Sequence, residues 1–413
     1  PGSGRIFVPV RGDATLHWAD VGPDGHVACG QENNGGACDD LHRAGNDPEQ
    51  ENTRDLRLGA EPFGIAASWN GEAIMVTNQT SGAASLFVNP WLNQENDAGP
   101  KLEFRLEQLS SRPVGVTAVP PPARILAQPA VRNGYAPAFL VTFRNTPEVV
   151  LVRYYSDSEY VGRQEGSPNN VASPSRPFVT RLGTAFASPN SPGTDSRGIV
   201  ADDASRRELE QRCFAAAGIT DSCLSDYGVN GKEGCIAQAG GAGAALDDCL
   251  AQASRQPLDF FVASRSPASL LVGSSWVTND AIGNNEIPSF YDSIPLTVGP
   301  SRVVTGEVIV GGDAQVITDA QEDTLIRERR VFVVSFDSRR VFIYDPVRRR
   351  LDAEVTTGRG PYAISVDSKH GHLYIGQFTD SFISVVSLDR RHPRTYAQVL
   401  ATIGAPSAPR TSK

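Results

Sequence analysis

The chain has 413 residues, a net charge of −9, 40% hydrophobic residues, 39 glycines and 29 prolines. The negative charge argues against a nucleic-acid partner, because phosphate binding needs clustered positive charge. No run of about 18 apolar residues occurs, so the sequence predicts no transmembrane segment. The abundance of Gly and Pro favours many short strands joined by tight turns over long helices.

Six pairs of short apolar segments follow one another along the chain. In each pair the residues alternate or are β-branched and aromatic, and a short polar turn separates the two segments, which is typical of a β-hairpin. The pairs are Arg5–Val10 with Thr15–Trp18, Ala73–Thr77 with Ser85–Val88, Ala138–Phe143 with Val149–Val152, Asp259–Ala263 with Ser269–Val272, Val331–Ser335 with Val341–Tyr344, and His372–Gly376 with Ile383–Ser387.

Two of these pairs belong to a longer repeat. The segment Gly59-Ala60-Glu61-Pro62-Phe63-Gly64-Ile65 returns three hundred residues later as Gly358-Arg359-Gly360-Pro361-Tyr362-Ala363-Ile364, and both copies continue with two apolar runs at the same spacing. A repeated strand–turn–strand unit is typical of a propeller blade. We therefore predict an all-β fold, a single β-propeller over residues 1–413 with six blades. Seven blades is the alternative, if Val303–Val310 belongs to a blade of its own.

The two ends of the chain complement each other. The tail Thr402–Pro409 resembles the start of a blade that lacks its hairpin, and the N-terminus supplies a hairpin that lacks a start. Pairing of N- and C-terminal strands in one composite blade would close the ring and remove its edges. The abrupt start at Pro1 suggests a processed or trimmed chain, for which an upstream lipid anchor is an open alternative.

Two stretches interrupt the repeat. Ser156–Asp195 is rich in Ser, Pro, Gly and Asn and is predicted to be a long loop. Residues 204–256 form a cysteine-containing insertion within the fourth blade, between a strand near Gly198–Val200 and the next hairpin. Its segments Arg206–Phe214 and Ala244–Leu250 both have helical periodicity.

The six cysteines fall into two local groups, Cys29 with Cys38, and Cys213, Cys223, Cys235 and Cys249. An even number without a CxxC motif favours disulfides, although reduced cytosolic thiols are the alternative. Four cysteines permit three connectivities, and a helical hairpin would take the nested one, Cys213–Cys249 with Cys223–Cys235. Disulfides predict an exported protein, periplasmic or on the outer surface, and the preference for Arg over Lys suggests a bacterial source.

The repeat resembles the YVTN family of bacterial β-propellers, to which YncE-like periplasmic proteins belong. The resemblance lies in the G-x-x-P-[FY]-[GA]-I segments and in the strands Ile74–Asn78 and Leu373–Gln377, and it covers about half of the chain. It implies a propeller, usually of seven blades. It implies little about activity, because the repeat residues pack the blades against one another.

One set of polar residues occupies equivalent turns. Three positions after the central residue of the second strand in each blade, the turn should face the central funnel. These positions carry Arg11, Gln79, Arg144, Arg265, Asp337 and Phe378, of which the first five form the candidate ligand-binding ring. Converging arginines bind carboxylates or phosphates, but arginines in solvent-exposed turns are the simpler interpretation.

Other candidate chemistry is weaker. His370-Gly371-His372, the acidic turn Asn46–Asn52 and the pair Asp202-Asp203 contain metal-binding residue types, but none has the spacing of a metal motif, and solvated turns are favoured. No nucleophile elbow, P-loop or dinucleotide fingerprint is present. The sequence therefore predicts no catalytic residue, no metal and no cofactor.

Two functions remain. The first is an exported, non-catalytic propeller that binds a protein partner, as a scaffold or as a subunit of an envelope or surface assembly, with the insertion and long loops as its recognition surface. The second is a propeller enzyme of the lactonase or lyase type that acts on a small anionic substrate in the funnel, with Arg144, Arg265 and Asp337 as the first residues to suspect.

Overall fold

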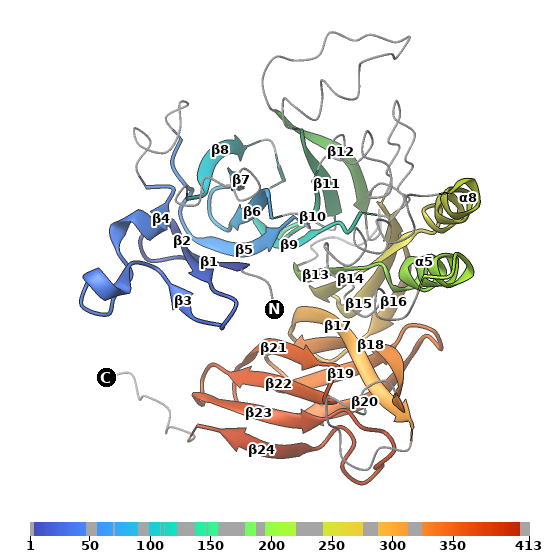
Figure 1. The fold of residues 1–413 in the computed structure, drawn as a ribbon. Helices are drawn as coiled ribbons and strands as arrows, with labels where there is room; N and C mark the ends of the chain where they lie inside the picture. Colours follow the sequence, from blue (N-terminus) through green and yellow to red (C-terminus); the bar gives the residue numbers. More distant parts are fainter. Residues whose placement is uncertain are drawn as a thin grey trace. The chain divides into compact units, whose positions relative to one another are not determined.

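The fold is seen in a computed structural model that describes part of the chain (Figure 1). The described residues are 4–46, 56–68, 71–89, 99–107, 109–110, 112–121, 137–146, 148–155, 178–186, 195–219, 243–275, 288–312 and 324–404. They form six four-stranded antiparallel sheets. These sheets are the blades of a β-propeller, so the predicted fold class and the count of six blades are confirmed.

The chain divides into two compact units, which are described separately. The first contains residues 1–186, 203–259 and 274–289, and therefore the first three blades and the helical insertion. Its sheets are β1 (Gly4–Val10), β2 (Thr15–Val21), β3 (Val27–Ala28) and β4 (Arg43–Ala44); β5 (Pro62–Ala67), β6 (Ala73–Asn78), β7 (Ala83–Val88) and β8 (Lys101–Leu106); and β9 (Pro113–Ala118), β10 (Ala138–Phe143), β11 (Glu148–Tyr155) and β12 (Phe178–Phe186). Two 3₁₀ turns, Gln31–Asn33 and Asp40–His42, lie in the first blade.

The second unit contains residues 187–202, 260–273 and 290–413, with most of the fourth blade and all of the last two. The sheets are β13 (Ser196–Asp202), β14 (Leu258–Arg265), β15 (Ala268–Ser275) and β16 (Pro288–Pro295); β17 (Pro300–Gly311), β18 (Ile326–Ser335), β19 (Arg340–Asp345) and β20 (Arg350–Thr356); and β21 (Pro361–Asp367), β22 (His372–Gln377), β23 (Phe382–Ser387) and β24 (Val399–Ile403).

The apolar strands form the cores between neighbouring blades. Strand β6 is buried along its whole length, because it lies in the blade between the first and the third. One of its faces contributes Met75 to a core shared with the third blade, and the other contributes Ile74 and Val76 to a core shared with the first. In the second unit, Phe332 and Val333 divide in the same way between two cores. Each such strand buries apolar surface on both faces. This removal of apolar surface from water is the main stabilising contribution in this fold.

The insertion forms two helices, as the sequence predicts. Helix α5 (Ala204–Ala216) and helix α8 (Ala244–Ala253) are joined by the disulfide Cys213–Cys249, with a Cα–Cα distance of 5.7 Å. Phe214 and Leu250 are fully buried beside it. The Cys29–Cys38 disulfide is also formed, whereas Cys223 and Cys235 lie outside the described residues.

Two sequence expectations are corrected. Val303–Val310 does not start a seventh blade, since it lies within β17 and pairs with β18. The predicted loop Ser156–Asp195 contains strand β12, which pairs with β11 along eight positions of that strand. An outermost strand is held by main-chain hydrogen bonds to one neighbour, so its sequence needs little apolar periodicity.

The first blade lacks an inner strand among the described residues. No described strand pairs with the free edge of β1, on which Ile6 and Val8 are about half exposed. Of the predicted closing segment, Thr402 and Ile403 belong to β24 and pair with β23. Residues 405–413 lie outside the described part of the chain, and the closing strand stays a prediction.

Candidate functional site

A single backbone hydrogen bond recurs at the start of five blades. The N–H of a residue at the end of the second strand, or directly after it, donates to the carbonyl of the residue just before the first strand. The pairs are Gln79 to Glu61 (3.0 Å), Arg144 to Arg112 (3.0 Å), Arg265 to Asp195 (2.9 Å), Phe336 to Gly299 (2.8 Å) and Phe378 to Gly360 (2.7 Å). This bond places two side chains of each blade next to each other at the same end of the inner strands.

The backbone at this position explains the repeated proline. Glu61, Arg112, Gly299 and Gly360 all have positive φ angles, of 52°, 62°, 89° and 67°, and each is followed by the Pro that opens the inner strand. Pro has no N–H to leave unpaired there, and its fixed φ suits the first residue of a strand. Two blades use the glycine that this conformation favours, and two use a charged residue instead.

In the first unit, three of the predicted ring residues lie near these positions. The Arg11 guanidinium pairs with the Glu61 carboxylate at 3.1 Å and lies 5.7 Å from the centre of the Phe63 ring. Gln79 is buried, and its backbone is bonded to that of Glu61. Arg144 is beside Arg112 through the recurring hydrogen bond. Glu61, which belongs to the repeated motif, and Arg112 are thus neighbours of the candidate ring that the sequence pattern did not single out.

In the second unit, Arg265 and Asp337 form an ion pair with each other, with side chains 32% and 38% exposed. Asp337 lies one position after Phe336, which makes the recurring backbone bond in its blade. The two residues are therefore not at equivalent positions. The pairing occurs because Asp337 lies in the β18–β19 turn and Arg265 ends strand β14 of the preceding blade.

These pairings weaken the case for a ready-made anion site. Arg11 and Arg265 each already contact a carboxylate, so their charges are largely offset before any ligand binds. The ring as a ligand site stays a proposal.

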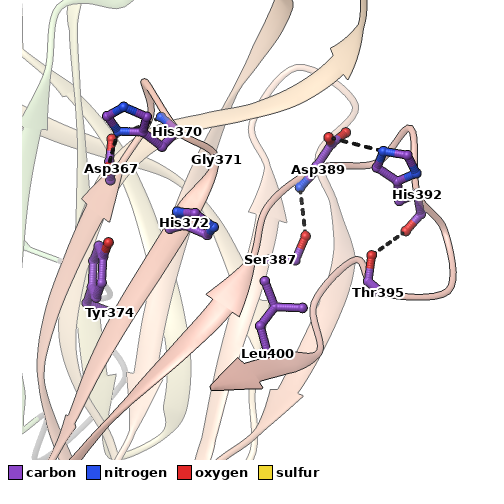
Figure 2. A pocket seen from close by; sticks show the side chains of 10 residues that line it. All are labelled: Asp367, His370, Gly371, His372, Tyr374, Ser387, Asp389, His392, Thr395 and Leu400. Carbon is purple, nitrogen blue, oxygen red and sulfur yellow. Dashed lines mark hydrogen bonds and ion pairs between the residues drawn. The ribbon is translucent and has the colours of Figure 1, made fainter. Parts of the chain in front are cut away.

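The second unit contains a pocket of about 410 Å³ in the last blade (Figure 2). Its walls come from the end of β21, the start of β22, the end of β23, the chain that leads to β24, and β24 itself. The lining residues are Asp367, His370, Gly371, His372, Tyr374, Ser387, Asp389, His392, Thr395 and Leu400. Figure 2 shows His370 and His372 on one side of the pocket, with Asp389 and His392 on the other.

The register of the sheet accounts for the centre of this pocket. Asp367 pairs with His372 across β21 and β22, and His372 pairs with Ser387 across β22 and β23. Paired residues on antiparallel strands point to the same face, so a carboxylate, an imidazole and a hydroxyl form one row across three strands. His370 and His372 are close together in the sequence, whereas His392 lies twenty residues further on, and only the folded blade brings it to this pocket.

Both pocket carboxylates are held by cations or N–H donors of their own blade. Asp367 accepts from the His370 backbone N–H (3.1 Å) and contacts its Nδ1 (2.8 Å). Asp389 accepts from Arg391 through Nε (2.9 Å) and Nη2 (2.7 Å). Burial acts to raise the pKa of each carboxyl, but these hydrogen bonds and charges outweigh it, and both pKa values lie below their usual range. Both groups are therefore ionised near neutral pH.

Among the residues with described structure, no group of three or more His, Cys, Asp or Glu side chains has an arrangement that could hold a metal ion. Within that same set, none of the helices combines the length and the apolar character that a membrane span requires.

Comparisons with known proteins add little to this picture. No protein-family model matches the chain. No curated protein matches it either. The resemblance to the YVTN family therefore stays a prediction.

Solved structures give faint likenesses. They include a protein from Desulfotomaculum acetoxidans (TM-score 0.49, 9% identity, covering 98% of this chain and 85% of that one), a protein from Lactobacillus plantarum (0.48, 9%, 97% and 82%) and a Bacteroides uniformis protein provisionally assigned as a 6-phosphogluconolactonase (0.48, 9%, 99% and 84%). Such likenesses say nothing about the ligand or activity of this chain, and the propeller assignment rests on its six sheets.

Proposed function

We propose that this protein is an exported, non-catalytic β-propeller that binds a protein partner through its helical insertion, as a scaffold of the bacterial envelope or surface. Export is supported by the Cys29–Cys38 and Cys213–Cys249 disulfides, which indicate an oxidising environment. Its location in the periplasm or on the outer surface is part of the proposal.

The observation that carries the proposal is the way the insertion is anchored. Arg206 of α5 is completely buried and donates from Nη2 to the carbonyl of Pro120, just after β9, at 2.7 Å. Its guanidinium also lies near the buried Glu210 carboxylate, at 3.9 Å. A disulfide, a buried arginine and a buried apolar face would together hold the helix pair firmly. Burial of the arginine costs free energy, and a segment that only linked two strands would not need it.

The opposite face of α5 is available to a partner. Glu208, Gln211 and Arg212 are exposed, and Glu208 pairs with Arg212 at 2.5 Å, with side chains 64% and 69% exposed. A rigid support that presents exposed polar side chains is typical of a recognition surface.

The test is a binding comparison with matched variants. We expect a partner captured from the native envelope by the wild-type protein to be lost, at least tenfold, when Glu208, Gln211 and Arg212 are all changed to Ala. The control removes another exposed ion pair, Arg340 with Glu354 on the fifth blade, by Ala substitutions. Equal capture by all three proteins, or by a folded variant without residues 204–256, would contradict the proposal.

The rival function is an enzyme of the lactonase or lyase type that uses the predicted ring. It is less well supported, since Arg11 and Arg265 are already paired with Glu61 and Asp337. If capture fails, turnover of small anionic lactones by the wild type, and its loss in Arg144→Gln, would favour this alternative.

A further inference from the structure

One stretch of the last two blades is basic although the chain as a whole is acidic. Residues 326–394 contain thirteen Lys and Arg but eight Asp and Glu, a net charge of +5, whereas the whole chain has a net charge of −9. The remaining residues therefore carry −14. Concentrated positive charge in an acidic protein raises the local concentration of anions.

The pocket of the sixth blade lies within this basic segment and is lined by three of the six histidines of the chain. Its two carboxylates do not oppose an anion strongly. Arg391 donates to both oxygens of the Asp389 carboxylate. The backbone N–H and the ring Nδ1 of His370 contact the Asp367 carboxylate. The imidazoles of His372 and His392 and the hydroxyl of Ser387 are further polar groups that line the pocket.

Donors for an anion are present on both sides. The His372 ring lies in the row between Asp367 and Ser387, and the Ser387 hydroxyl accepts from the Asp389 N–H at 3.3 Å, which leaves its own O–H able to donate. The His392 side chain is 61% exposed and only loosely paired with Asp389, at 3.8 Å. Tyr374 and Leu400 supply a less polar wall beside these donors (Figure 2).

We propose that this pocket binds a small phosphate-bearing ligand, with the phosphate held by the His372 and His392 imidazoles and the Ser387 hydroxyl. Imidazolium and hydroxyl groups give phosphate oxygens short, charge-assisted hydrogen bonds. A volume of about 410 Å³ is in the range of small-molecule sites. The proposal is independent of the helical insertion and of its partner.

The test uses the full chain, with inorganic phosphate and phenyl phosphate as probes. Binding is followed by calorimetry and by the imidazole C–H signals in NMR spectra at pH 6.0 and 7.5. We expect saturable binding at one site, with shifts of the His372 and His392 signals.

The variants distinguish phosphate binding in the pocket from nonspecific attraction of phosphate to basic side chains. His372→Gln with His392→Gln should weaken phosphate binding at least tenfold, and the exposed His392→Gln alone should weaken it severalfold without affecting folding. The control is His42→Gln in the first blade, where His42 contacts Asp39 through Nδ1 at 2.6 Å in the same i,i+3 arrangement.

Three results would overturn the proposal. They are the absence of saturable binding, equal binding by the pocket variants and the wild type, and tight binding of Zn²⁺ by the same histidines without any response to phosphate. The third result would identify a metal site instead.

Discussion

At the scale of single residues, the residue before the inner strand has a positive φ angle in four blades, and this angle limits which amino acids fit there without strain. Gly360 and Gly299 meet the conformation without strain, whereas Arg112 and Glu61 adopt it with a full side chain. A left-handed φ costs an L-residue about 1–2 kcal/mol of stability. If this position served packing alone, glycine would be favoured over a charged residue. Arg112 and Glu61 both lie at the inner-strand ends where the sequence predicts ligand contacts.

We expect Arg112→Gly to stabilise the protein by about 0.5–1 kcal/mol, since relief of strain exceeds the extra entropy of glycine in the unfolded chain. Gly360→Ala should destabilise it by about 2 kcal/mol or more, because the new Cβ would meet Thr379 Oγ1 and lie 2.9 Å from the Thr379 nitrogen. Urea unfolding measures both changes.

The control for these changes is Gly71→Ala, which has a φ of 69° but open space around the new Cβ. It isolates the cost of the backbone angle from that of the contact. A loss in Gly71→Ala as large as in Gly360→Ala would show that crowding at Thr379 is unimportant.

At the scale of elements, a buried ionic network joins three strands of the fifth blade to the sixth. Arg330 of β18 is 1% exposed and contacts Glu328 (2.7 Å), Asp345 of β19 (3.4 Å) and Asp352 of β20 (3.0 Å). The Tyr396 hydroxyl, from the sixth blade, donates to the Asp352 carboxylate at 2.7 Å. Removing one partner would leave a buried charge unpaired, which costs more than the pair contributes.

The outer member of this network gives a pH prediction. Hydrogen bonds from Arg348 and then Arg330 lower the pKa of Glu328 from 4.5 to about 2. A carboxyl whose pKa is lower in the folded state stabilises the protein above its unfolded pKa, and this stabilisation is lost as the pH falls towards 2. Glu328→Gln should therefore lower the free energy of unfolding at pH 7 by about 1 kcal/mol, since the group is a third exposed and partly screened.

Unfolding of wild type and Glu328→Gln between pH 7 and pH 3 checks this expectation. The difference between the two proteins should shrink as the pH falls below about 4.5. Glu32→Gln, an exposed change of the same charge, is the control and should show no such trend. A constant difference across the whole pH range would mean that the carboxyl is not held by the two arginines.

At the scale of the whole molecule, no strand among the described residues pairs with the free edge of β1 in the first blade. The β1–β2 turn ends in a positive-φ residue, Ala14, as do the turns that end in Gly82, Arg339 and Ser381 after second strands. The β19–β20 turn ends in the same conformation at Arg349, and the β21–β22 turn at Gly371, so this angle alone does not assign β1 its place in the blade. If β1 is a second strand, its free edge is where an inner strand would pair. An unpaired apolar edge in water favours association with another strand.

If the tail supplies that strand, removal of residues 405–413 should lower the thermal midpoint by several degrees. Removal of 399–413 should lower it further, because β24 also leaves β23. An unchanged midpoint after the shorter truncation would exclude the tail as the closing strand. An equal effect of the two truncations would show that β24 contributes little.

The sequence alone determined the six hairpins, the insertion and its helices, because period-2 alternation and helical periodicity are local properties that burial on one or both faces imposes. Strand β12 escaped prediction because its stability comes from main-chain pairing with β11. The ligand-binding ring stays a prediction, and the ion pairs of Arg11 and Arg265 depend on neighbouring blades that no local pattern specifies.

Only the tertiary structure brought His392 back to His370 and His372, fixed the row from Asp367 to Ser387, and buried Arg206 against Pro120. Such contacts join residues far apart in sequence, so their formation depends on strand register and on the path of loops, which packing of the complete blade decides.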